Sequence, residues 1–325
     1  MEVRRHGFSE YTALDEALEI IFSKLRKTGK EKVHFEEAWE RILAEDIEAK
    51  ANVPPFDRAA MDGFAVRAED TFGATENDPE KVQLVGSIEI GSESEVKIGE
   101  GDAAEISTGA PMPEGANAVV KIEDTFQEGS TIMIISPVSP GKNVSSTGED
   151  VESGTRILEE GRLIRPSDIG IIASTNNLNL KVRKKPKIGI AASGNELREP
   201  GEELKPGQIT EANTYTLSPA IRGAGGLPTR LGIVPDDVDK IKEILNRSDE
   251  FDMLILTGGT SVGKEDLIPD VISEEGDFIL HGIAIRPGGP TGFGIVNETP
   301  IFSLPGFPAA TLVAFEMLVK PALRK

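Results

Sequence analysis

Residues 257–266, with the sequence TGGTSVGKED, contain the residue types that point most directly to chemistry. They follow the apolar run 253–256, so the sequence predicts a buried strand, a turn rich in glycine and hydroxyl groups, and then a helix. In α/β proteins such a turn directs backbone N–H groups at an anion, and glycine lets the backbone come close to it. We interpret the segment as a loop that holds a phosphate or pyrophosphate, with Asp266 placed to hold a cation beside it.

Two better-known phosphate motifs do not describe this segment. Residues 258–264 satisfy G-x-x-x-x-G-K, but Glu265 stands where a P-loop has the Ser or Thr that binds Mg²⁺. The G-x-G-x-x-G pattern of a Rossmann domain is not present in the chain. The segment therefore predicts an anion loop of another kind.

Composition narrows the chemistry that the chain can perform. The 325 residues predict two or three domains, and a net charge of −20 argues against a nucleic-acid binder. The chain has no cysteine and only three scattered histidines, so thiolate chemistry and imidazole metal sites are not expected. Any metal would be a hard cation with oxygen ligands, and Mg²⁺ is the first candidate. No apolar stretch has the length of a signal sequence or a membrane span, so we expect a soluble cytoplasmic protein without membrane contact.

The first half of the chain predicts helices at both ends of a β-rich unit. Residues 9–28 have the apolar spacing of an amphipathic helix, with Thr12 and Asp15 as a capping box and Gly29 as its end. Residues 35–45 predict a second helix, in which Trp39 is a core or interface anchor. A short helix opens at Pro166, with Ser167 as its N-cap. Between them, residues 51–139 predict an all-β unit without a helix, with strands at 82–90, 104–107, 118–123 and 131–135.

From residue 187 onward, strands alternate with helices, which predicts a parallel α/β domain with short connections. The predicted strands are 187–192, 228–233, 252–257, 278–285, 292–296 and 301–304, and the predicted helices are 213–222, 237–247, 265–274 and 308–320. Ligands of such sheets bind outside the carboxyl ends of the strands. Three unusual turns fall there, at 193–196, at 257–261 and at 304–308.

Three weaker signals lie outside the α/β domain. Asp62 follows a proline-stiffened segment, and it is either a functional carboxylate or the first residue of a turn bonded to its own backbone. Residues 109–117 form a rigid loop, which is either a binding edge or a structural turn. Asp150 is either a metal ligand or a solvated carboxylate.

Together these segments resemble the molybdopterin molybdenumtransferase family, which includes MoeA proteins and the E domain of gephyrin. The resemblance spans residues 8–324. It rests, in order, on AAMDGFAV, STGAPMPEGANAVV, GKNVSSTGED, ASGNEL, TGGTSVGKED, IRPGGPTGFG and LPGFPAATLVAFE.

The resemblance implies a multidomain α/β plus β fold. Residues 1–28 would form a helix on a three-layer, MogA-like molybdopterin-binding domain at 181–325. Residues 29–50 with 140–180 would form an elongated linker and dimerisation domain, and 51–139 the inserted β-rich domain. The sequence ends at Lys325, where members of that family continue into a C-terminal β-barrel domain.

The resemblance also implies the reaction and its participants. The reaction would be insertion of molybdate (or tungstate) into adenylylated molybdopterin, with Mg²⁺-dependent release of AMP. The implied assembly is a homodimer with a composite site, in which Asp62 and Thr108 of one subunit lie over the α/β site of the other. A molybdopterin adenylyltransferase and cofactor-accepting enzymes are further implied partners.

Functional residues can be transferred from the family by position. The catalytic set is Asp62, Asp150, Glu196, Asp266 and Arg286, of which Asp62, Asp150 and Asp266 would hold the metal. The substrate-binding set is Thr108, Gly109, Ser193, Gly194, Thr257, Gly258, Gly259, Thr260, Ser261, Pro305 and Gly306.

The sequence departs from the family pattern at several of these motifs. Residues 145–147 are Ser-Ser-Thr where the family has a basic stretch, and Gly289 replaces a lysine. Asn195 replaces an aspartate, Glu211-Ala212-Asn213 replaces Asp-Ser-Asn, and Phe307 replaces an asparagine. Two alternative functions therefore stay open: a scaffold that binds the pterin nucleotide or a protein partner, and a Mg²⁺-dependent pyrophosphate hydrolase.

Overall fold

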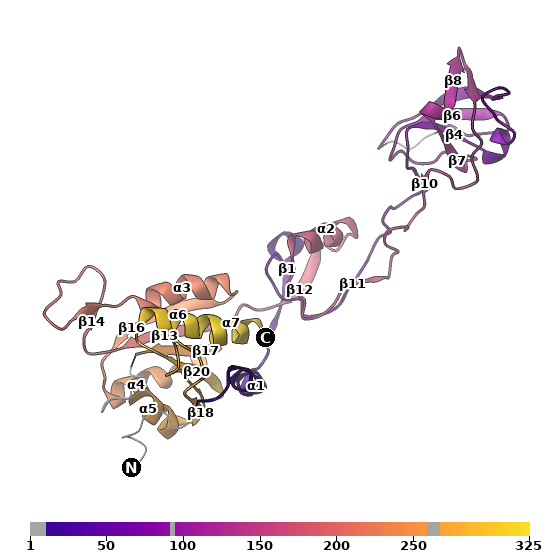
Figure 1. Cartoon of the computed structure of the whole chain (residues 1–325). Coiled ribbons are helices and arrows are strands. Elements are labelled where there is room, and N and C mark those ends of the chain that lie inside the picture. The colour runs from indigo at the N-terminus through magenta and orange to yellow at the C-terminus, as the bar shows by residue number, and fades with distance from the viewer. Residues whose placement is uncertain (1–10, 92–94, 259–266) are drawn as a thin grey trace. The chain divides into compact units, whose positions relative to one another are not determined.

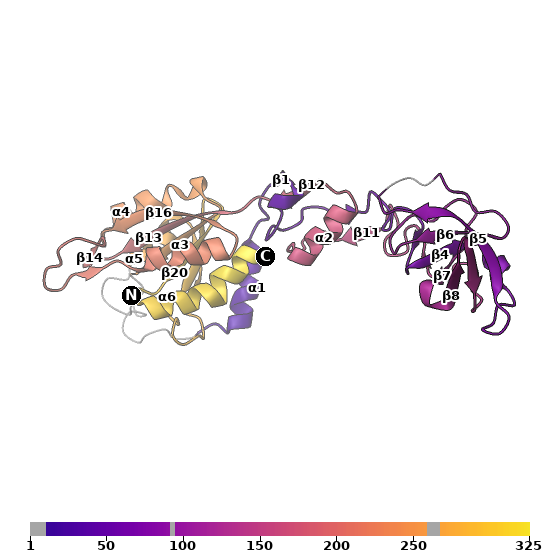
Figure 2. The same cartoon turned by 90° about the horizontal axis from the view of Figure 1, so that it is seen from above.

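The computed structural model describes residues 11–91, 95–258 and 267–325 and divides the chain into two compact units (Figures 1 and 2). Unit 1 contains residues 1–31 and 182–325, and unit 2 contains residues 32–181. The chain leaves unit 1 within strand β1 (Lys30–His34) and returns within β12 (Asn179–Arg183), and these two strands pair. Within the described ranges, no helix combines the length and the apolar character needed to cross a bilayer.

Unit 1 is built around a six-stranded sheet in the order β16-β13-β17-β20-β19-β18. Its strands are β13 (Lys187–Ser193), β16 (Leu227–Val234), β17 (Met253–Thr257), β18 (Asp277–His281), β19 (Gly292–Val296) and β20 (Thr299–Leu304). Strands β16, β13, β17 and β20 run parallel. Strands β17 and β20 bury every residue, because helices cover both faces of the sheet.

Helices cover the sheet of unit 1 in two layers (Figures 1 and 2). One layer contains α1 (Leu14–Lys24), α3 (Asn213–Gly223) and α6 (Pro308–Ala314), which continues through the π-helical segment η6 (Phe315–Val319) into α7 (Lys320–Arg324). The other layer contains α4 (Val238–Leu245) and α5 (Leu267–Glu275). The expected three-layer α/β class is therefore confirmed.

The last hairpin of unit 1 corrects the expectation of an entirely parallel sheet. Strand β19 runs antiparallel to both β20 and β18. Only Asn297 and Glu298 separate β19 from β20, and both have positive φ (49° and 67°). A two-residue turn of this kind closes an antiparallel hairpin, whereas a parallel connection needs a dozen or more residues.

Two helix boundaries in unit 1 differ from the sequence prediction. Helix α1 spans Leu14–Lys24, within the predicted 9–28, and its N-cap is Ala13 without a side-chain cap. The Thr12–Asp15 capping box is therefore wrong, since the Thr12 backbone instead bonds to Gly282 and Ala284. Helix α4 spans Val238–Leu245, within the predicted 237–247, and its N-cap is Asp237, whose side chain accepts a hydrogen bond from the N–H of Lys240.

Unit 2 contains a second six-stranded sheet, in the order β7-β4-β6-β5-β9-β8. Its strands are β4 (Gly63–Val66), β5 (Glu80–Ile88), β6 (Asp102–Ile106), β7 (Ala118–Lys121), β8 (Thr125–Glu128) and β9 (Thr131–Ile134). The predicted strands 82–90, 104–107, 118–123 and 131–135 correspond to β5, β6, β7 and β9. Strands β4 and β8 were not predicted. In the described part of residues 51–139 the helical elements are two short 3₁₀ turns, η3 (Ala68–Thr71) and η4 (Ile122–Asp124).

The remainder of unit 2 includes η2 (Phe35–Glu37), β2 (Ile47–Glu48), β11 (Arg156–Leu158) and α2 (Pro166–Ser174). The predicted helix at 35–45 is wrong, because only the 3₁₀ turn η2 forms there. The backbone of this segment bonds to residues 162–164 instead: Glu40 N–H donates to Ile164, and Leu43 N–H donates to Arg162. Trp39 is 57% exposed and is not a core residue.

Helix α2 opens at Pro166, as predicted, but its N-cap lies two residues earlier than predicted. Its N-cap is Arg165 and not Ser167. The carboxylate of Asp168, which is 4% exposed, accepts the backbone N–H of Arg165 at 2.9 Å. It also accepts two hydrogen bonds from the guanidinium of Arg162, at 3.0 and 2.8 Å. An acidic side chain therefore starts the helix from inside its first turn.

Candidate functional site

The three unusual turns of the α/β domain meet at one edge of its sheet. Strands β13, β17 and β20 are adjacent and parallel, and Ala192 is in register with Thr257, which is in register with Leu304. The turns that follow these strands therefore start side by side, as predicted. Both the sequence pattern and the sheet topology indicate that a ligand site of unit 1 would lie at the carboxyl ends of β13, β17 and β20.

Gly258 brings the backbones of these turns into contact. Its φ is +97°, and a Cβ at this position would lie 2.2 Å from the carbonyl oxygen of Ser193. Its N–H donates to the carbonyl of Leu304 at 3.1 Å. A Cβ on Gly306 would lie 3.5 Å from the Cα of Gly258. Position 258 therefore excludes every side chain, which fits a glycine where backbone and ligand approach closely.

The turn after β13 is held by an aspartate that the sequence analysis missed. Asp236 accepts a hydrogen bond from the hydroxyl of Ser193 at 2.8 Å and from the N–H of Asn195 at 3.2 Å. The side-chain oxygen of Asn195 accepts the N–H of Asp236 at 3.2 Å in return. Asp236 follows β16, the neighbour of β13. The rule that ligands bind outside the carboxyl ends of parallel strands could therefore have identified it from the sequence. An aspartate at 195 would place a second carboxylate against Asp236, which Asn195 avoids.

Two buried polar side chains lie at this edge without all their hydrogen bonds. Asn213, at the start of α3, donates from Nδ2 to the carbonyl of Gly306 at 2.8 Å, but its Oδ1 has no partner within the described ranges. The hydroxyl of Thr257, which is 1% exposed, has none there either. Because an unpaired buried polar group is costly, such atoms mark places where a bound group would complete the bonding.

The remaining predicted residues of unit 1 differ in their surroundings. Gly194 donates its N–H to Val234 at 3.2 Å, and Glu196 is exposed. Pro305 is buried, and its carbonyl accepts the hydroxyl of Thr311. Arg286 is exposed and forms no ion pair with another described residue.

Gly289, which replaces a lysine of the family pattern, is buried against Tyr11. A Cβ at this position would lie 3.1 Å from the Tyr11 ring and 3.3 Å from the carbonyl of Ile285. A lysine would therefore require the ring of Tyr11 to move. Four predicted residues, Gly259, Thr260, Ser261 and Asp266, lie outside the described ranges.

In unit 2, three segments that are far apart in the sequence converge around strand β3 (Arg58–Ala59). β3 pairs with β10 (Val144–Ser145) in antiparallel register. On its other side, Ala59 N–H donates to Ala110 at 2.9 Å, and Gly109 N–H donates to Ala59 at 2.8 Å. The segments around Asp62, Thr108 and Asp150 are thus joined by backbone hydrogen bonds.

Asp62 and Thr108 are in direct contact, although 46 residues separate them. Oδ1 of Asp62 accepts the backbone N–H of Thr108 at 2.7 Å and its hydroxyl at 2.9 Å. These two hydrogen bonds, the backbone one first, lower the pKa of the Asp62 carboxyl. Both residues are exposed. The simpler alternative, in which Asp62 only bonds its own turn, is therefore wrong.

A second pair of the same kind was missed by the sequence analysis. Oδ1 of Asp57 accepts the N–H and the hydroxyl of Thr147, each at 2.7 Å. These bonds lower the pKa of the Asp57 carboxyl. Asp57 lies in the same proline-stiffened segment as Asp62, which is the signal that could have singled it out.

Two exposed carboxylates of unit 2 have oxygens of the kind that a magnesium ion takes as ligands. Asp62 uses only Oδ1, and the exposed carboxylate of Asp150 accepts no hydrogen bond from a described residue. Mg²⁺ keeps several waters and commonly takes one or two carboxylates together with substrate phosphates. No group of three metal-binding side chains is gathered within the described ranges.

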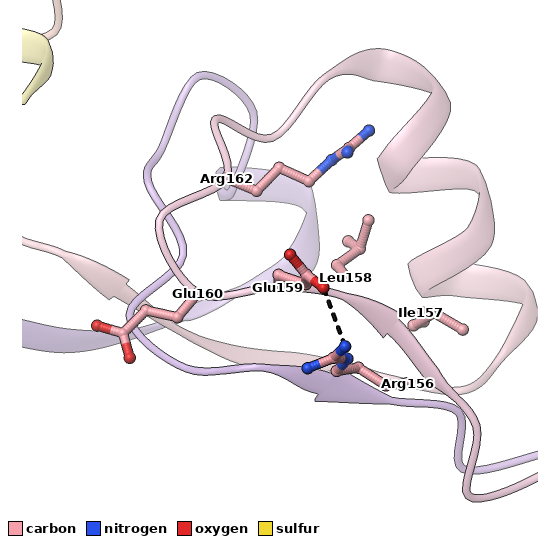
Figure 3. A pocket seen from close by; sticks show the side chains of 6 residues that line it. All are labelled: Arg156, Ile157, Leu158, Glu159, Glu160 and Arg162. Atoms are coloured by element: carbon pink, nitrogen blue, oxygen red, sulfur yellow. Dashed lines mark ion pairs between the residues drawn. The ribbon is translucent and has the colours of Figure 1, made fainter.

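A separate hollow on unit 2 is lined by charged side chains of β11 and the turn after it (Figure 3). The two arginines that line the hollow, Arg156 and Arg162, already form ion pairs. Arg156 contacts Glu159 at 3.0 Å and Asp46 at 3.2 Å, and Arg162 binds Asp168. None of the predicted site residues lines it, and we assign it no ligand.

Comparison with known proteins gives matches along most of the chain. Residues 12–176 match a family model described as the MoeA N-terminal region (domains I and II), and residues 190–325 match one described as a probable molybdopterin binding domain. A Bacillus subtilis molybdopterin molybdenumtransferase is 37% identical over 320 residues, which cover 96% of this chain and 74% of that protein. A Mycobacterium tuberculosis molybdopterin molybdenumtransferase 2 is 37% identical, over 87% of this chain and 72% of that protein.

Solved structures support the same assignment. The crystal structure of a molybdopterin biosynthesis MoeA protein from Pyrococcus horikoshii has a TM-score of 0.86 and 35% identity. The match covers 97% of this chain and 79% of that one.

The family models and the curated relatives thus identify a transferase with an α/β domain of the molybdopterin-binding class and an N-terminal region of the MoeA type. The chain belongs to the molybdopterin molybdenumtransferase family, whose members act in molybdenum cofactor biosynthesis.

Proposed function

We propose that this chain inserts molybdate (or tungstate) into adenylylated molybdopterin and releases AMP in a Mg²⁺-dependent reaction. The observation that supports this most is the close approach of three backbone turns at Gly258, at the edge where β13, β17 and β20 end. Backbone N–H groups at such an edge bind phosphate oxygens without a cationic side chain. This suits an acidic chain that acts on an anionic substrate.

The residues of the strand edge would hold and orient the substrate. The turn at Gly258 would receive its phosphate groups, and the free Oδ1 of Asn213 would accept a hydrogen bond from a donor on the substrate. Asp236 orients the Ser193 hydroxyl, so the Ser193 oxygen is left as an acceptor. Holding the reacting groups in place reduces the entropic part of the barrier.

The carboxylates of unit 2 would hold the magnesium ion that assists the release of AMP. Hydrogen bonds from Thr108 favour the ionised form of Asp62, and the carboxylate of Asp150 accepts no hydrogen bond from a described residue. Asp62, Asp150 and Asp266 are the residues we propose as magnesium ligands, and bound Mg²⁺ would neutralise the charge that develops as AMP leaves. We further propose a homodimer in which Asp62 and Thr108 of one subunit complete the α/β site of the other.

The function is tested by measuring AMP release from adenylylated molybdopterin with purified protein, Mg²⁺, and molybdate or tungstate. We expect release that depends on the oxyanion and stops when EDTA removes Mg²⁺. Asp266→Asn should lose release, while Glu128→Gln, on the exposed strand β8, should not.

The alternatives give different results in the same assay. Tight binding of the pterin nucleotide without AMP release would identify a scaffold. Release of AMP that is indifferent to the oxyanion, and that extends to other nucleotide pyrophosphates, would identify a hydrolase.

A further inference from the structure

Phe307 is an aromatic residue that the fold leaves in water. Its side chain is 81% exposed, more than any other large apolar side chain in the described part of the chain. It is the N-cap residue of α6, whose buried residues are Ala310, Thr311 and Ala314. The core of unit 1 therefore gains nothing from this ring, and burial of such a ring would release a large apolar area from water.

Hydrogen bonds from Thr311 hold the backbone that carries the Phe307 ring. The carbonyl of Phe307 accepts the N–H of Thr311 at 2.9 Å and its hydroxyl at 3.0 Å. The same hydroxyl donates to the carbonyl of Pro305, and Pro308 follows directly. The main chain is thereby held on both sides of the residue, so only two side-chain torsions stay free. Little entropy is lost when a side chain of this kind binds a partner.

The position of Phe307 adjoins the strand-edge site. The preceding residue, Gly306, lies against Gly258, and its carbonyl accepts the amide of Asn213. Asn213, which is 8% exposed, carries one of the three buried polar side-chain atoms that lack a hydrogen-bond partner in the described part of the chain. Phe307 thus follows a residue that lies against Gly258, where we propose that the phosphate binds, and that contacts Asn213, whose Oδ1 has no partner in the described part of the chain. This is the arrangement expected for a nucleotide-like ligand, which joins a phosphate to a planar heterocycle.

We propose that Phe307 stacks on a heteroaromatic ring of the substrate, and this inference rests on the proposed function. Adenylylated molybdopterin offers two such rings, the pterin and the adenine. Stacking does not depend on a particular hydrogen-bond pattern, because each ring has a π face. Phe307 is therefore a binding residue that positions the substrate beside the Gly258 turn.

Fluorescence can test the contact directly, because Trp39 is the only tryptophan of the chain. A Phe307→Trp variant in a Trp39→Phe background carries a single reporter. We expect AMP or a phosphorylated pterin to quench its emission, and the ring that quenches it identifies the stacked one. Ribose 5-phosphate, which has no aromatic ring to stack, should leave the emission unchanged.

Substitutions separate stacking from other roles. Phe307→Ala lacks the fluorescent reporter, so its affinity is measured by calorimetry: the Kd of the ligand that quenches Phe307→Trp should rise about 5- to 150-fold, as loss of one base–aromatic stack predicts. Phe307→Tyr should restore affinity and Phe307→Leu should not, since leucine keeps apolar surface without a ring. With the whole substrate, Phe307→Ala should raise KM and leave kcat nearly unchanged. Phe126→Ala removes another exposed ring, 61% exposed on β8, and should change none of these values.

The results that overturn the inference are separate from those that overturn the function. If the native chain releases AMP and Phe307→Ala or Phe307→Leu keeps the native Kd and KM, the stacking assignment is wrong and the function stands. If the native chain neither binds a ring-containing probe nor turns over the whole substrate, the inference and the proposed function fail together.

Discussion

Two aspartates of one short segment, Asp57 and Asp62, are each held by a threonine that is distant in the sequence. Each uses a single carboxylate oxygen to accept both the N–H and the hydroxyl of its threonine. The bonds favour the charged form of each carboxylate, so the pKa of both is lowered. Asp62 and Asp57 therefore stay ionised at pH values where an isolated aspartate begins to take up a proton.

The substitution Thr108→Val tests this effect at Asp62. It removes the hydroxyl donor but keeps the backbone N–H, so the pKa of Asp62 should rise partway toward the ordinary aspartate value. A lowered pKa in the folded state contributes stability above the ordinary value, which is lost as the pH falls through the folded pKa. The stability that Asp62 contributes should therefore be smaller in Thr108→Val, and its loss should be complete at a higher pH than in the native chain. Carboxyl-carbon NMR titration measures the pKa directly.

A matched variant provides the control. Thr147→Val should raise the pKa of Asp57 and leave that of Asp62 unchanged. An unchanged Asp62 titration in Thr108→Val would show that the hydroxyl contributes nothing to the carboxylate.

At the scale of elements, Gly258 sets how closely β17 approaches β13. The substitution Gly258→Ala places a methyl group 2.2 Å from the Ser193 carbonyl oxygen, at a φ of +97°. Gly201→Ala has a similar φ of +94° but open space around the new methyl group. Left-handed backbone should cost about 1–2 kcal/mol in both variants. Overpacking should add about 1–3 kcal/mol in Gly258→Ala alone.

Urea unfolding of the two variants measures this difference. Equal losses of unfolding free energy in Gly258→Ala and Gly201→Ala would show that the turns are not in close contact at position 258.

The start of α2 depends on Asp168, which joins the Arg162 guanidinium to the first turn of the helix. Asp168→Ala should lower the unfolding free energy by about 1–3 kcal/mol, since it removes a cap and the partner of an arginine. Asp168→Asn should lower the unfolding free energy by less, because the side-chain oxygen of asparagine can still accept a hydrogen bond from the N–H of Arg165.

The charge of Asp168 also predicts a pH dependence. Its hydrogen bonds from Arg162 lower its pKa, and the backbone N–H of Arg165 acts in the same direction against the effect of burial. The stability difference between the native chain and Asp168→Asn should therefore be full above the ordinary aspartate pKa and fade as the pH falls through the lowered one. Thermal unfolding across that range measures it, and a constant difference would mean that the charge of Asp168 is not involved.

At the scale of the whole molecule, the proposed composite site makes a prediction about mixed dimers. Asp62→Asn and Glu196→Gln should each lose AMP release on their own. If Asp62 of one subunit serves the α/β site that contains Glu196 of the other, a mixed dimer regains one intact site. Random exchange of subunits should then restore about a quarter of the native activity, since half the dimers are mixed and each has one intact site.

The same experiment distinguishes the arrangement within the assembly. Two inactive variants that stay inactive after subunit exchange, with mixed dimers detected by native mass spectrometry, would place Asp62 and Glu196 in the site of a single subunit.

The sequence by itself determined the strands of the unit 1 sheet, four of the six strands of the unit 2 sheet, and the edge of unit 1 at which a ligand site would lie. Apolar runs and their spacing are local properties, so five of the six strands of unit 1 fall within a few residues of their predicted ranges. The sixth, β18, begins as predicted and ends earlier, where Gly282 takes a φ of 91°. The three strand-end turns were identified from the same local pattern.

Only the tertiary structure decided which distant residues hold one another. Local spacing predicted a helix at 35–45, but hydrogen bonds to residues 162–164 replace it. Local turn chemistry gave Asp62 no partner beyond its own backbone, whereas the sheet of unit 2 places Thr108 against it. The contact of Asp236 with Ser193 follows only from the position of β16 beside β13. Propensity acts over a few residues, while these contacts join backbone and side chains 40 to 125 positions apart, where only the topology of the folded chain brings them together.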